Sequence, residues 1–288
     1  MSMKNEVNIE KNTDTTMGLK YREDKHLCFL KDQDSEKLDV LVRILIYDKD
    51  GEQRYTEELS EESKYIRHKP NHQEYWDLIT AEYQRFGGNS FMNFFRSKGV
   101  LYEEILTDVC DKMKVKFSKG DTVDEIEKNM LSRVMKDIFE EMSEKEREEF
   151  LRDLNIDTMD FSKQATLLAL QTAIRSSGFM AYQFAVIIAN TIAKQLLGHG
   201  LKFVANAGIV RAIGVLAGPV GLAVTGVWTV VDIAGSAYRV TIPATIYIAA
   251  LRQAELHKDT FEMRCPSCEA IIIDRSSETC KECGEEYK

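Results

Sequence analysis

Residues 164–251 carry very little charge, and this segment limits what the chain can fold into more than any other feature. Its charged side chains are five bases and one acid, a net charge of +4, whereas the 288-residue chain as a whole carries −9. Nine of the 16 glycines also lie in this segment. Because so many apolar side chains must leave water, we expect the segment to be buried in a helical core or in a membrane.

Two charge-free stretches in this segment approach the length of a membrane-spanning helix. Residues 212–231 give twenty such positions and residues 176–193 give eighteen, and about 20 apolar residues cross a bilayer. However, the longer stretch has Gly-Pro-Val-Gly at residues 218–221, which would break a helix in hydrocarbon. The shorter one contains Gln183 and Asn190. The sequence alone leaves membrane contact and a buried core as alternatives.

The N-terminal half is predicted to be helical. Between residues 21 and 46, leucine, valine and isoleucine recur every three or four positions. This spacing places them on one face of one or two short helices, and residues 48–51 form a turn signal. An aromatic stripe begins at Tyr75, and we expect Gly87 and Gly88 to end its helix.

Two capping boxes predict where further helices begin. In each, a threonine or serine is followed three residues later by a glutamate: Thr122 with Glu125, and Ser143 with Glu146. In this motif the hydroxyl accepts a hydrogen bond from the third backbone N–H, and the glutamate accepts one from the capping residue. Together these patterns predict a mainly α fold.

Four of the six cysteines form two Cys-x-x-Cys pairs near the C-terminus. Cys265 and Cys268 are followed, after eleven residues, by Cys280 and Cys283. Four thiolates in two tight knuckles can close a tetrahedral shell around Zn²⁺, and about 24 residues cannot build a hydrophobic core of their own. The spacing predicts a structural zinc ribbon with these four ligands, with a redox dithiol or an iron–sulfur cluster as alternatives.

No motif of a common enzyme class is present. The sequence lacks the P-loop, the dinucleotide-binding glycine fingerprint, the hydrolase nucleophile elbow and the His-Glu-x-x-His motif. Its acidic balance argues against non-specific nucleic-acid binding. His68 and His72 are four apart, but Pro70 interrupts the helix that would bring them together. We therefore predict a non-enzymatic protein without catalytic or cofactor-binding residues.

Three segments carry a family resemblance: residues 76–90, 99–109 and 235–244. They resemble the bacterial YaaW family, and the resemblance covers most of residues 21–255. It groups the chain with the ubiquinol-cytochrome c chaperone domain, and residues 21–45 resemble a small N-terminal module found with that domain. The resemblance implies no catalytic residues, because none are established for the family. The cysteine tail is an addition to the shorter members.

From these features we expect five parts along the chain. They are a disordered tail (1–20), a small helical module (21–50), an acidic helical domain (51–160), a glycine-rich apolar helical segment (161–256) and a Cys₄ zinc ribbon (261–288).

The function expected from these parts is that of an intracellular adaptor or chaperone-like assembly factor. It would have a protein partner, would engage a membrane or a hydrophobic partner through residues 164–251, and would bind no specific nucleic acid. Two alternatives are a membrane-perturbing effector restrained by its N-terminal domain and an enzyme of an unrecognised class. The polar N-terminus predicts no signal peptide, and we expect the protein in the cytoplasm or at the cytoplasmic membrane, as a peripheral or an integral protein. The sequence gives no oligomeric state.

Overall fold

The chain is mainly helical in the parts that the computed structural model describes, which confirms the predicted fold class. Residues 1–17 of the predicted tail and residues 213–231 of the longer charge-free stretch lie outside these parts. The described residues are 18–48, 50–90, 99–156, 158, 160, 162–176, 178–201, 212, 237–261, 263–264, 267–268, 271–272, 279–280 and 283–286.

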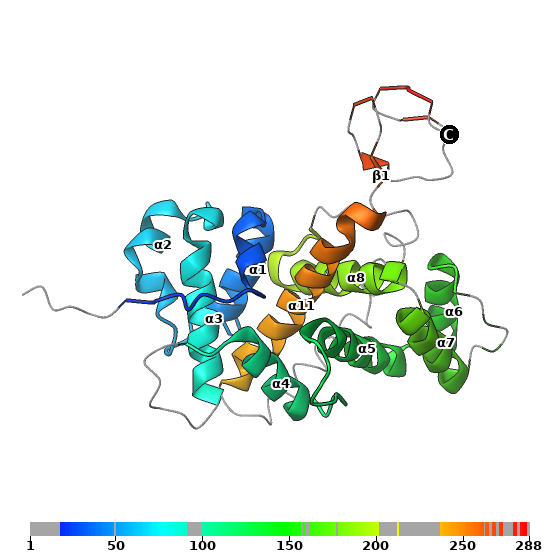
Figure 1. The fold of residues 1–288 in the computed structure, drawn as a ribbon, viewed down its shortest axis with the longest axis horizontal. Coiled ribbons are helices and arrows are strands. Elements are labelled where there is room, and N and C mark those ends of the chain that lie inside the picture. Colours follow the sequence, from blue (N-terminus) through cyan, green and yellow to red (C-terminus); the bar gives the residue numbers. More distant parts are fainter. Residues whose placement is uncertain are drawn as a thin grey trace, which may run out of the picture.

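Helices follow one another along the described chain, and a pair of short strands comes last (Figure 1). The helices are η1 (Cys28–Asp32), α1 (Ser35–Ile46), η2 (Leu59–Glu61), α2 (Ser63–His68), η3 (His72–Tyr75), α3 (Trp76–Ser90), α4 (Tyr102–Lys112), α5 (Val123–Glu141), α6 (Glu144–Asp153), α7 (Lys163–Ser176), α8 (Gly178–Leu197) and α11 (Tyr238–Phe261), where η marks a 3₁₀ helix. The antiparallel strands are β1 (Met263–Arg264) and β2 (Ile271–Ile272).

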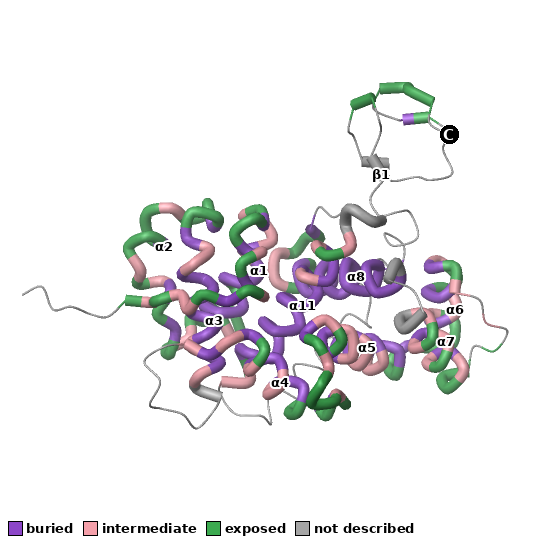
Figure 2. Tube along the Cα trace, viewed as in Figure 1, coloured by how far each residue is buried: buried purple, intermediate pink, exposed green. Residues whose placement is uncertain are grey.

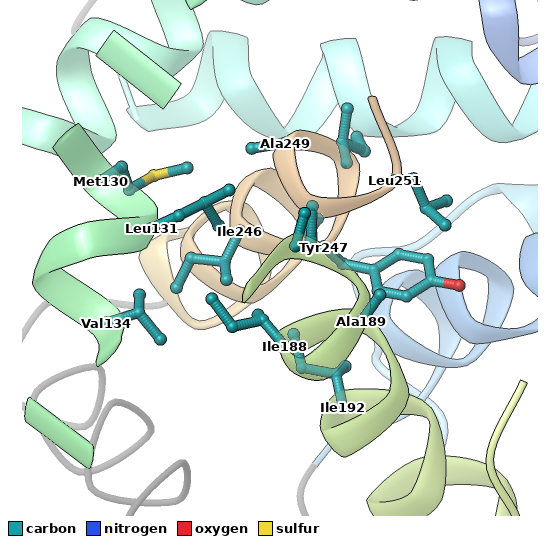
Figure 3. Packing of buried hydrophobic residues seen from close by; sticks show 14 of the residues in the cluster. Met130, Leu131, Val134, Ile188, Ala189, Ile192, Ile246, Tyr247, Ala249 and Leu251 are labelled. Carbon is teal, nitrogen blue, oxygen red and sulfur yellow. The ribbon is translucent and has the colours of Figure 1, made fainter. Parts of the chain in front are cut away.

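Helix α11 is the centre of the fold. It packs most extensively against α8, and it also contacts α1, α3, α4 and α5. In Figure 1 it crosses the molecule between α1–α3 on one side and α5–α7 on the other. In the core, Ile246 of α11 points toward Val134 of α5 and Ile188 of α8, and Tyr247 of α11 lies beside Ala189 of α8 (Figure 3). Burial of these apolar side chains is the main force that holds the three helices together.

Helix α8 corresponds to the shorter charge-free stretch and lies inside the protein core. Figure 2 shows it buried along most of its length, and it contacts α1, α5, α7 and α11. Among the residues that the structure describes, no helix combines the length and the apolar character needed to cross a bilayer.

Asn190 has a structural role in α8. Its Nδ2 donates to the Val186 carbonyl at 3.1 Å, and its Oδ1 accepts a hydrogen bond from the Leu201 backbone N–H at 2.8 Å. A Cβ on Gly200 would lie 2.9 Å from the same Oδ1. The buried amide therefore fastens the loop that follows α8, which explains a polar residue in this apolar stretch.

Both capping boxes are confirmed. Thr122 Oγ1 accepts from the Glu125 backbone N–H at 3.3 Å, and the Glu125 carboxylate accepts from the Thr122 N–H at 2.7 Å. The corresponding distances for Ser143 and Glu146 are 3.3 Å and 2.8 Å. Helices α5 and α6 thus begin directly after the two capping residues, as the sequence predicts.

The prediction that Gly87 and Gly88 end the aromatic helix was wrong, because α3 continues to Ser90. The reason is a close approach between two helices. A Cβ on Gly87 would lie only 2.4 Å from Cδ1 of Ile105 on α4. Glycine is required there so that α3 and α4 can pack against each other, and it does not act as a helix stop.

Candidate metal centre and a buried polar cluster

Three of the four predicted zinc ligands lie together. The Sγ atoms of Cys268, Cys280 and Cys283 are all within 4.8 Å of one another, and the Cys268 and Cys280 sulfurs are 3.7 Å apart. Cys265, the fourth predicted ligand, lies outside the described residues. The two remaining cysteines are not part of the group: Cys28 is exposed, and Cys110 is buried in α4.

Short backbone contacts shape the second cysteine knuckle. The Gly284 N–H donates to the Cys280 carbonyl and the Cys280 N–H donates to the Glu285 carbonyl, both at 2.8 Å. Gly284 has a φ of +74°, which glycine adopts without steric cost. The chain therefore turns sharply at this point, and Thr279 pairs with Glu286 in an antiparallel bridge. With this turn, the thiols of Cys280 and Cys283 lie close to each other and to the thiol of Cys268.

The sulfur positions fit a tetrahedral thiolate site. With Zn–S distances of about 2.3 Å, two sulfurs of a tetrahedral shell lie roughly 3.8 Å apart, and the 3.7 Å between Cys268 and Cys280 matches this spacing. The same distance is far longer than the bond of about 2.0 Å that a disulfide needs. The three described cysteines could therefore hold a soft metal ion.

A second group of polar side chains, buried or half-buried, lies between α4, α5 and α11, and we call it the Glu127 cluster. No pattern in the sequence predicts this cluster. Its members are Asp24, His26, Tyr102, Asp124, Glu127, Arg252 and Gln253.

Glu127 of α5 is the centre of this cluster and is fully shielded from solvent. Tyr102 of α4 donates its hydroxyl proton to Oε1 at 2.7 Å. From α11, the Gln253 amide donates to Oε2 at 2.6 Å, and the Arg252 guanidinium lies 3.5 Å from the same oxygen. Because three groups meet one carboxylate, the cluster ties three helices together.

The segment before α1 joins this cluster from outside the helices. The Asp24 carboxylate accepts from the backbone N–H of Tyr102 at 2.6 Å, where it caps the start of α4, and from the His26 N–H at 2.8 Å. His26 Nδ1 lies 3.3 Å from the Arg252 guanidinium. Further along, the Gln33 amide donates to Glu255.

Burial changes the protonation of several groups in the cluster. It raises the pKa of Glu127 to about 7, although Arg252, Gln253 and Tyr102 all favour the charged form. Burial, together with the positive charge of Arg252, lowers the pKa of His26. The cluster therefore holds a carboxyl group that can change its charge near neutral pH.

His68 and His72, the two histidines considered in the sequence analysis, do not form a metal site. Helix α2 ends at His68 and η3 begins at His72, so the interruption expected at Pro70 is confirmed. His72 is buried and lies between Asp39, 3.2 Å from its Nε2, and the Tyr75 hydroxyl. This arrangement joins α1 to η3.

Comparison with known proteins identifies the family of the chain. The family model described as ubiquinol-cytochrome C chaperone matches residues 71–246, and a domain of unknown function, DUF3944, matches residues 21–55. A UPF0174 protein of Helicobacter pylori strain J99 is 45% identical over 233 residues, which is 81% of this chain and 92% of the relative. The chain belongs to the YaaW (UPF0174) family. The Escherichia coli K12 YaaW protein is 34% identical over 242 residues, or 82% of this chain and 97% of that protein.

The two family models cover the Glu127 cluster in part and do not reach the thiol cluster. The two family models cover Asp24, His26, Tyr102 and Glu127, but they end before Arg252 and before the cysteines. No solved structure matches this YaaW-family chain. The candidate metal centre therefore rests on the geometry of its own thiols.

Proposed function

We propose that this YaaW-family chain is a non-enzymatic adaptor or assembly factor with a chaperone-like role. The observation that carries the proposal is the match of residues 71–246 to the ubiquinol-cytochrome C chaperone model. In this proposal the helical body engages a protein partner that exposes apolar surface, and it does so through those side chains of residues 164–251 that are not buried in the core, such as Leu168 of α7. The absence of common catalytic signatures in the sequence supports a binding role.

The C-terminal tail has a structural part in this proposal. Cys265, Cys268, Cys280 and Cys283 bind one Zn²⁺ ion, which supplies the free energy that so short a segment needs to fold. Four cysteine ligands close the coordination shell, so the metal does not activate water or substrate. The clustered thiols of three of these residues support the site.

Replacing Cys280 and Cys283 together with serine is expected to reduce bound zinc from about one ion per chain to almost none, because two of the four ligands are lost. The helical circular dichroism signal should persist, since the apolar core extends from Leu27 to Ala254 without the tail. Metal analysis and circular dichroism of the purified variant measure both effects.

Cys28→Ser provides a matched control, because Cys28 is exposed and lies outside the thiol cluster. This control should retain its zinc. Zinc retention in the double variant would contradict the metal site. Loss of most of the helical signal would show that the tail is integral to the main fold.

The functional proposal predicts how the untagged, full-length chain behaves in a bacterial extract. After centrifugation, the chain should be in the supernatant both with and without carbonate treatment. On size exclusion of the untreated supernatant, it should co-migrate with a partner. Because an apolar contact is not screened by salt, high salt should preserve this complex and mild detergent should dissolve it. Migration as a free chain would contradict the proposal. If the chain instead stays in the membrane pellet after carbonate and is extracted only by detergent, it binds a membrane and not a protein partner.

A further inference from the structure

The Glu127 cluster connects parts of the chain that are far apart in sequence. Asp24 and His26 come from the segment before α1, Glu127 from α5, and Arg252 from the second half of α11. His26 and Arg252 are separated by 226 positions. The cluster therefore joins the N-terminal segment to α4 and α11, and it joins α11 to α5.

We propose that the Glu127 cluster is a proton-responsive latch, which holds α11 on α4 and α5 more firmly when Glu127 is protonated than when it is ionised, and which reaches residues 21–33 through the contact of Arg252 with His26. The proposal goes beyond the adaptor function, and it does not depend on the zinc site.

The geometry of the cluster accommodates both charge states of Glu127. As a carboxylate, Glu127 accepts hydrogen bonds from Tyr102 and Gln253 and lies beside Arg252. As a neutral acid, it can donate to the Tyr102 oxygen across the same 2.7 Å, because a phenol oxygen also accepts hydrogen bonds. The neutral form also avoids the cost of burying a negative charge in a fully shielded position.

Charged and titratable groups from each element packed around the cluster interact with Glu127 or with its neighbours in the cluster. They are Asp24 and His26 from the N-terminal segment, Tyr83 from α3, Tyr102 and Cys110 from α4, Asp124 and Lys128 from α5, and Arg252 and His257 from α11.

The titration of these groups does not change the stability of the folded chain in the same direction for every group. Burial raises the pKa of Glu127 from 4.5 to about 7, so protons stabilise the folded chain in this range, and the contribution is lost as pH rises through 7. Burial lowers the pKa of His26 and of His257, whose contributions are therefore lost as pH falls below 6.5. For Asp124, hydrogen bonds from Lys128 and Gln253 outweigh burial and lower the pKa, so its contribution is lost in more acidic solution.

Glu127→Gln isolates the contribution of Glu127, because the amide cannot ionise. The test is hydrogen–deuterium exchange of the full chain at several pH values between about 5 and 8, corrected for the intrinsic exchange rate. We compare the opening equilibrium of residues 21–33 and 245–257 in the wild type with that in E127Q. As the pH rises to 7, the ratio of the two should increase by up to about tenfold per pH unit, and above pH 7 it should level off. Glu141→Gln, at the exposed end of α5, should behave as the wild type.

Two results would overturn the latch. One is an identical pH response of these segments in E127Q and wild type. The other is an equal response in α6 and α7, which would indicate global instability and not local detachment. If E127Q does not fold, NMR of the assigned Glu127 carboxyl carbon in the wild type decides: titration of Glu127 close to pH 7 supports the latch, and titration of Glu127 below about 5.5 excludes it, whatever the buried Glu82 does.

Discussion

Replacing Phe150 with alanine should lower the free energy of unfolding by about 3–5 kcal/mol. Phe150 of α6 is fully buried. Its ring meets Phe139 of α5 edge to face at a centroid distance of 5.1 Å, and it stacks with Phe184 of α8 at 6.3 Å. Removal of the ring leaves a cavity where three helices join and abolishes both aromatic contacts. Urea unfolding monitored by circular dichroism measures the loss.

The control for this variant is Leu168→Ala on α7, because Leu168 is 66% exposed. We expect a change within about 0.5 kcal/mol for this surface position. A loss below about 1 kcal/mol for Phe150→Ala would mean that α6 does not pack on α5 and α8 in solution.

The second large effect is expected for Arg85→Met, which should destabilise the chain by about 3 kcal/mol near pH 8. Arg85 holds the fully buried Glu82 with two contacts, 3.0 Å from Nε to Oε2 and 2.6 Å from Nη2 to Oε1. It also lies 3.2 Å from Glu58 and donates to the Thr56 carbonyl. Methionine keeps the apolar stem but leaves the Glu82 carboxylate buried without its cation.

The effect of this substitution should depend on pH. Burial already raises the pKa of Glu82, although Arg85 opposes the shift, and removal of Arg85 raises the pKa further. In acid, Glu82 takes up a proton and the uncompensated charge disappears, so the loss should be smaller near pH 5 than near pH 8. Thermal unfolding at both pH values measures the difference.

Arg152→Met serves as the comparison, because Arg152 forms an exposed ion pair with Glu148 within α6. Such pairs contribute at most about 1 kcal/mol. If Arg85→Met were no more destabilising than Arg152→Met at either pH, Glu82 would be solvated in solution.

Local patterns in the sequence were sufficient to predict the elements that depend on local physics. The apolar residues that recur between residues 21 and 46 are buried on η1 and α1. The capping boxes mark the starts of α5 and α6. Each of these features is determined by residues a few positions apart, so periodicity and capping chemistry suffice.

The features missed by sequence reasoning depend on distant contacts. Gly87 has the usual form of a helix stop, and only the neighbouring Ile105 on α4 shows that it serves close packing. Glu127 lies in a helix rich in charged residues, where a glutamate is normally solvated. Its burial becomes visible only when Arg252 and Gln253 are brought to it by the fold. The four-thiol zinc site stays a prediction, supported by three clustered thiols.

The central position of α11 has a consequence for folding of the chain during its translation. Roughly 190 residues separate the end of α1 at Ile46 from the start of α11 at Tyr238, which corresponds to about 10–40 s of translation at 5–20 residues per second. From its own synthesis until that of α11, each of the helices α1, α3 and α5 lacks the helix that later covers its apolar face. The nascent chain therefore carries uncovered apolar surface until its synthesis is almost complete.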